Sequence, residues 1–109
     1  MPPDDAIRIR HMIEAASAAL RFCIGRRRED LDTDDMLRFA LTRAVEIIGE
    51  AATKVSLETR AASPQLPWPA IVGMRNRLVH AYFDVDSDIL WTTVVDRLPA
   101  LLADLQALD

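Results

Sequence analysis

The amino-acid sequence predicts an all-α domain. Ala, Leu, Arg, Glu and Asp are abundant and glycine is scarce, a composition that favours helices over sheets. Apolar residues recur at helical spacing along most of the chain. With 109 residues and no internal repeat, the chain is expected to form a single domain over residues 1–109.

The first helix is expected from near Asp4 to near Gly25. Its apolar stripe is Ile9, Ile13, Ala16, Leu20 and Ile24. The polar stretch "RRREDLD" at 26–32 follows as a solvated connection. The alternative is that its three arginines, Arg26 to Arg28, contact a polyanion.

The second helix is expected to start within "DTDD" at 32–35, where acidic side chains can cap it, and to run to about Arg60. Its buried face is predicted to be Leu37, Leu41, Ala44, Ile48, Ala51 and Val55. Its opposite, solvated face carries Glu46, Glu50 and Lys54.

The loop "SPQLPWP" at 63–69 separates the second helix from the third, because proline is excluded from helix interiors. Pro69 suits the first turn of a third helix over 70–83, and Asp86 is a candidate cap for a fourth. Pro99 is expected to kink or split that fourth helix. Its apolar stripe is Trp91, Val95, Leu98, Leu102 and Leu105.

Net charge and cysteine content restrict the class of protein. A formal net charge of −4 argues against coating nucleic acid by bulk electrostatics, although a local basic site is compatible with it. The single cysteine, Cys23, cannot form an intramolecular disulfide. No apolar run approaches the roughly 18 residues of a membrane span. We therefore expect a cytoplasmic protein that makes no contact with a membrane.

Arg75 occupies an unusual place on the third helix. On a helical wheel at about 100° per residue, it falls inside an apolar arc that includes Tyr82. Asn76 and His80 lie at the edge of that arc, and Arg77 points to the far side. A guanidinium among apolar residues costs several kcal/mol unless it is paired or opens onto a site.

Two interpretations of Arg75 therefore stay open. In one, it meets a carboxylate of another helix, and His80 is a satisfied edge histidine. In the other, Arg75, Asn76, His80 and Tyr82 form one functional patch, although about 140° separates Arg75 from His80 on the wheel.

The remaining residues support little other chemistry. Two histidines, His11 and His80, and one cysteine give no zinc-binding spacing. A glycine-rich phosphate loop and a hydrolase triad are both absent from the sequence. We expect no metal and no cofactor. The residue types around His80 best support metal-free acid/base chemistry on a phosphate ester.

The stretch "RNRLVHAY" at 75–82 resembles the motif of HEPN-domain ribonucleases: Arg75, four residues, His80, one residue, Tyr82. Three longer stretches resemble HepT-like proteins in the same order. They are "EIIGEAA" at 46–52, "LPWPAIVGMRNRLVHAYFDVD" at 66–86 and "LWTTVVDRLPALL" at 90–102. Ala81 stands where glycine is most frequent in the family motif.

The resemblance implies a HEPN-type up-and-down four-helix bundle that cuts RNA, either tRNA or mRNA, without a metal. It implies a toxin that forms a homodimer and is paired with an MntA-like nucleotidyltransferase antitoxin. That antitoxin would silence the nuclease by transferring AMP to Tyr82.

The resemblance also implies roles for individual residues. His80 would act as general base or acid, Arg75 would stabilise the phosphorane, and Asn76 would orient the phosphate or His80. In a dimer, Arg75 of one copy could meet His80 of the other. The alternative is a non-catalytic helical module that binds a nucleotidyltransferase or its substrate.

Overall fold

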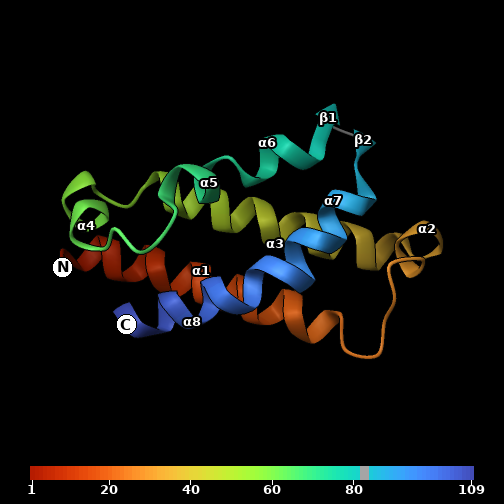
Figure 1. Ribbon diagram of the computed structural model, residues 1–109, viewed down its shortest axis with the longest axis horizontal. Helices are drawn as coiled ribbons and strands as arrows, with labels where there is room; N and C mark the ends of the chain where they lie inside the picture. The colour runs from red at the N-terminus through yellow and green to blue at the C-terminus, as the bar shows by residue number, and fades with distance from the viewer. Residues whose placement is uncertain (82–83) are drawn as a thin grey trace.

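A computed structural model describes the backbone of residues 1–81 and 84–109 and, within them, the side chains outside 79–81. The long helical segments pack side by side, and each runs opposite to the one before it (Figure 1). They are α1 (Pro3–Phe22), α3 (Asp35–Thr53), α5 (Trp68–Val72) with α6 (Met74–Leu78), and α7 (Ser87–Thr92) with α8 (Leu98–Leu108). The prediction of an all-α, up-and-down bundle is confirmed.

Smaller elements join these segments. They are α2 (Asp30–Thr33), α4 (Leu57–Ala62), β1 (Val79–Ala81) and β2 (Asp84–Val85). The two strands pair antiparallel, with Val79 opposite Val85 and Ala81 opposite Asp84. Both chain termini lie at the end of the bundle next to α4, whereas the strand pair lies at the other end (Figure 1).

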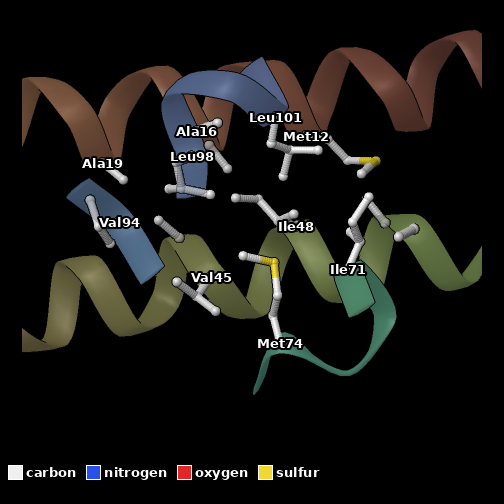
Figure 2. Packing of buried hydrophobic residues seen from close by; sticks show 14 of the residues in the cluster. Met12, Ala16, Ala19, Val45, Ile48, Ile71, Met74, Val94, Leu98 and Leu101 are labelled. Carbon is white, nitrogen blue, oxygen red and sulfur yellow. The ribbon is translucent and has the colours of Figure 1, made fainter. Parts of the chain in front are cut away.

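The core is formed where α3 meets the other three segments. All six residues predicted for the buried face of the second helix are buried. Figure 2 shows Ile48 of α3 pointing into the cluster, with Met12 of α1, Met74 of α6 and Leu98 of α8 around it. Within the described residues, no helix is both long and apolar enough to span a membrane.

The first helix is shorter than predicted. It ends at Phe22, and Ile24, expected on the buried stripe, is 77% exposed. Gly25 then turns the chain with a φ of 72°, a conformation that glycine adopts without a steric penalty. The rest of the predicted stripe is buried or partly buried.

The second helix ends earlier than predicted, and a polar network around Asp5 follows its end. α3 stops at Thr53, and Ser56 caps α4 by accepting a hydrogen bond from the Thr59 N–H. The buried Asp5 carboxylate accepts bonds from Ser56 N, Ser56 Oγ and Thr59 Oγ1 at 3.0, 2.6 and 2.6 Å. The side-chain bond from Ser56, followed by that from Thr59, lowers the Asp5 pKa. Asp5 thus ties the start of α1 to α4.

The fourth helix is divided as Pro99 predicted. Asp86 caps α7 by accepting a bond from Ile89 N at 3.0 Å. A π-helical turn, Thr93–Arg97, separates α7 from α8, whose first turn contains Pro99. Proline has no N–H to donate, so the regular hydrogen-bond ladder is interrupted there.

The buried stripe of this fourth segment lies mostly one residue earlier than predicted. Its residues are Leu90, Val94, Leu98, Leu101 and Leu105. The predicted Trp91, Val95 and Leu102 lie beside it, half-buried. Both stripes belong to one broad apolar arc of the helix. Packing against the other segments buries the residues at the centre of this arc.

Candidate active site around α6

The short helix α6 presents its polar residues between two buried anchors. Met74 and Leu78, four residues apart, are 5% and 0% exposed. Arg75 is half-buried, and Asn76 and Arg77 are exposed. The i, i+4 spacing of the anchors fixes one face of the helix on α3 and leaves the intervening side chains toward the surface.

Arg75 forms an ion pair with Glu46 of α3. Its Nε–H donates to Glu46 Oε2 at 3.2 Å. The Arg75 side chain is 43% exposed and that of Glu46 is 26% exposed. This pair matches one part of the first interpretation of Arg75, a carboxylate of another helix at the guanidinium, and leaves the choice between the two interpretations open. Because the contact uses only the Nε edge, the Nη groups have no partner among the described residues.

Arg77 is exposed, in agreement with its predicted place on the far side of the third helix. Its Nη2 donates to the Ala70 carbonyl of α5 at 2.6 Å. Arg77 also lines a surface cavity of about 220 Å³ between α5–α6 and the π turn with α8, together with Arg97. The Asn76 side chain makes no hydrogen bond to any residue that the structure describes.

The third helix does not extend to 83 as predicted. It ends at Leu78, and the Leu78 carbonyl accepts a bond from Asp86 N at 2.7 Å. The backbone of His80 belongs to β1. The 140° that a continuous helix would place between Arg75 and His80 therefore does not apply.

Two predicted site positions are not tested by this geometry. The side chain of His80 and the whole of Tyr82 lie outside the part of the chain that the structure describes. The described geometry thus brings Arg75 to Glu46, and the roles of Asn76, His80 and Tyr82 stay predictions.

Comparison with known proteins identifies the family. A family model described as "Ribonuclease HepT-like" matches residues 12–108, almost the whole chain. The chain belongs to the HepT-like ribonuclease family. The resemblance of the motif at 75–82 is thereby confirmed at the level of the family.

Individual HepT-like relatives agree with this assignment. "Probable ribonuclease HepT" of Thermococcus cleftensis is 42% identical over 73 residues, which are 67% of this chain and 66% of the relative. The matched part is thus just under two thirds of that relative. A "Putative RNase" of Methanocaldococcus jannaschii is 33% identical, covering 87% of each chain. Another from Caldanaerobacter subterraneus is 34% identical over 85% of this chain and 83% of the relative. No solved structure matches this HepT-like chain.

Glu46 is the site residue of this HepT-like chain that the sequence did not assign. It was placed on the solvated face of the second helix, yet it is the partner of Arg75. The available signal is Arg75 itself, because a guanidinium in an apolar arc is stabilised by a carboxylate from another helix unless it opens onto a site. Helical periodicity cannot say which helix supplies it.

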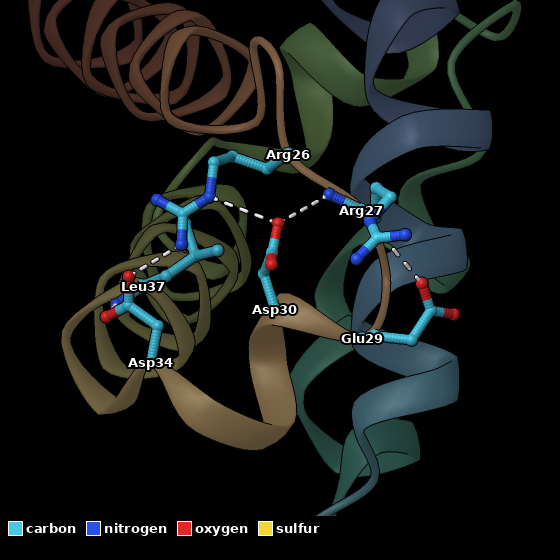
Figure 3. A network of polar contacts seen from close by, with 6 residues as sticks. All are labelled: Arg26, Arg27, Glu29, Asp30, Asp34 and Leu37. Carbon is cyan, nitrogen blue, oxygen red and sulfur yellow. Dashed lines mark hydrogen bonds and ion pairs between the residues drawn. The ribbon is translucent and has the colours of Figure 1, made fainter.

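The arginines at 26–28 are largely occupied within the molecule. Arg26 donates to Asp34 at 2.6 Å and to Asp30 at 3.2 Å (Figure 3). The bond from Arg26 lowers the pKa of the Asp34 carboxyl. The bond from the Arg27 N–H, followed by that from Arg26, lowers the pKa of the Asp30 carboxyl. Arg28 pairs with Asp32 and Asp88. These pairs favour the solvated connection over a contact with a polyanion.

Over residues 1–81 and 84–109, side chains included where they are described, no three His, Cys, Asp or Glu residues gather closely enough to hold an ion.

Proposed function

We propose that this HepT-like chain is a metal-independent endoribonuclease that acts as the toxin of a toxin–antitoxin pair. The observation that carries the proposal is the way in which Arg75 is held and exposed. Its Nε edge is held by Glu46, its side chain is 43% exposed, and it stands five residues before His80 in a ribonuclease family. An arginine held in this way is suited to binding a phosphate by its remaining fork.

The proposed reaction is an internal phosphoryl transfer. His80 removes the proton of the ribose 2′-hydroxyl, and the 2′-oxygen attacks the neighbouring phosphorus. The bond from phosphorus to the 5′-oxygen then breaks, and that oxygen takes a proton from a general acid. The products are a 2′,3′-cyclic phosphate and a 5′-hydroxyl. Arg75 donates to the non-bridging oxygens as charge develops there, and Asn76 orients the phosphate or His80.

The active form is proposed to be a homodimer in which two motifs share one cleft. The reaction needs a base at the 2′-oxygen and an acid at the 5′-oxygen, but each chain has one motif histidine, His80. A second copy supplies the other. The resemblance to HepT-like proteins favours this arrangement.

Chelation tests the proposed reaction. We expect the purified protein to have the mass of a dimer in light scattering. Its cleavage of RNA should be undiminished in EDTA and should leave cyclic phosphate ends, because the attacking oxygen comes from the substrate. A 2′-deoxy nucleotide at the cut site should block cleavage at that bond. Loss of activity in EDTA that magnesium or manganese restores would contradict the mechanism, as would cleavage at the deoxy position.

Control of the toxin is proposed to act at Tyr82. In the proposed step, the Tyr82 hydroxyl gives its proton to a base on an MntA-like nucleotidyltransferase, its oxygen attacks the α-phosphorus of ATP bound there, and pyrophosphate leaves. The resulting anionic phosphodiester can pair with Arg75 by a charge-assisted contact worth roughly 1.5–3 kcal/mol. The attached nucleotide would occupy the cleft as a mimic of the RNA backbone.

Modification at Tyr82 is tested by incubating the protein with an MntA-like nucleotidyltransferase and ATP. We expect AMP to be found on Tyr82 by peptide mass spectrometry, with cleavage falling in proportion to its occupancy. Tyr82→Phe keeps the ring and removes the acceptor oxygen, so it should stay active in the same incubation. A Phe variant that is still modified and silenced would place control elsewhere.

The competing function is a non-catalytic module that binds a nucleotidyltransferase or its substrate. Its specific expectation is binding without cleavage in protein purified away from any partner. The chelation experiment therefore separates the two functions directly.

A further inference from the structure

We propose that Glu46 is a positioning residue for Arg75, which it holds with the Nη edge of the guanidinium turned toward the scissile phosphate. The inference rests on the proposed function and names a residue that this function does not require by motif. It follows from the contact between Arg75 Nε and Glu46 Oε2 at 3.2 Å.

The guanidinium has two edges that can form paired hydrogen bonds, one between Nε and an Nη and one between the two Nη groups. Glu46 takes the Nε–H. The edge between the Nη groups then remains for a phosphate, and it has no partner among the described residues. A carboxylate at this place fixes which edge the substrate meets.

Fixing the side chain matters because arginine is long and flexible. Ordering a free arginine costs rotamer entropy, and a 1 Å misplacement of a catalytic group can cost about 10² in rate. A guanidinium already held by Glu46 has less freedom to lose when the transition state forms. The effect is therefore expected in kcat.

The fold holds Glu46 itself in place. Its neighbours Val45 and Ile48 are fully buried in the core (Figure 2). One turn along α3, Gly49 lies under α5, where an added Cβ would be 3.5 Å from the Ile71 and Val72 carbonyl oxygens. The antiparallel course of α3 and α5–α6 then sets Glu46 beside Arg75.

A purely structural ion pair predicts a different result. Pairs as exposed as this one, 43% and 26%, contribute little to the free energy of unfolding. If the pair had only a structural role, replacing Glu46 would leave kcat nearly unchanged. A large loss of kcat in a protein of normal melting temperature can therefore be assigned to Arg75 positioning.

The test compares Glu46→Ala, Glu46→Gln and the control Glu50→Gln by kcat, KM and melting temperature. Glu50 lies one turn further along α3 and is exposed, with Arg43 at 3.5 Å. We expect Glu46→Ala to lower kcat by about 10- to 100-fold with KM nearly unchanged. Glu46→Gln keeps an oxygen acceptor for the Nε–H and should recover most of that loss. Glu50→Gln should match the parent chain.

A double-mutant cycle ties the effect to Arg75. The side chain of Arg75→Lys has neither an Nε–H edge nor a planar fork for Glu46 to hold. Adding Glu46→Ala to Arg75→Lys should therefore lower kcat by less than a further threefold. An equal loss in both backgrounds, or a Glu46→Ala enzyme within twofold of the parent, overturns the positioning role. If Arg75→Ala and His80→Ala retain full cleavage, the proposed function itself fails, whatever Glu46 does.

Discussion

Replacing His80 by alanine is expected to lower the rate of RNA cleavage by about 10² to 10⁴, the contribution of a well-placed general acid or base. Arg75→Ala should cause a comparable loss, because the phosphorane would lose its main cationic donor. Cleavage is measured on one defined RNA under single-turnover conditions, so that chemistry is separated from product release.

The His80→Ala and Arg75→Ala variants must also be shown to be folded. Arg75 is 43% exposed and its ion pair is partly solvated, so we expect its removal to change the melting temperature very little. Circular dichroism and a thermal melt provide the control for both. Arg77→Ala is the matched control for Arg75→Ala. Arg77 also lies on α6, two residues further along, but it bonds to the Ala70 carbonyl instead of Glu46. Parental cleavage by folded His80→Ala would remove His80 from the mechanism.

Ile48→Ala is expected to destabilise the protein by about 2–5 kcal/mol. Ile48 is completely buried among α1, α3, α6 and α8, and the truncation leaves a cavity that so many packed segments cannot fill (Figure 2). The loss is a large part of the roughly 5–15 kcal/mol that stabilises an ordinary domain. Urea unfolding followed by circular dichroism measures it.

Met36→Ala provides the control on the same helix. Met36 is 83% exposed, and its truncation should change the free energy of unfolding by less than about 0.5 kcal/mol. Equal destabilisation by the two substitutions would show that the Ile48 cluster is not the main core.

The sequence predicted those parts of the fold that depend on local rules. The buried face of α3 follows from helical periodicity, because each of its residues faces the same direction. The caps at Asp34 and Asp86 follow from short polar side chains placed before apolar runs. The division of the last helix follows from the missing N–H of Pro99.

The parts that it did not predict depend on contacts between distant residues. α3 ends early where Ser56 meets Asp5, a residue 51 positions away. The third helix ends at Leu78 where a strand pair forms, although 70–83 has an acceptable helical pattern. The Glu46–Arg75 pair likewise spans 29 positions. Propensity and periodicity contain no information about such partners.

The place of the two termini has a practical consequence for experiments in living cells. Both lie at the end of the bundle opposite the strand pair that contains the His80 backbone (Figure 1). A fluorescent protein or affinity tag joined to either end is therefore carried away from α6. The abundance of the protein and the growth arrest that the proposed toxin function predicts can then be followed in the same culture, with the surface around α6 left uncovered.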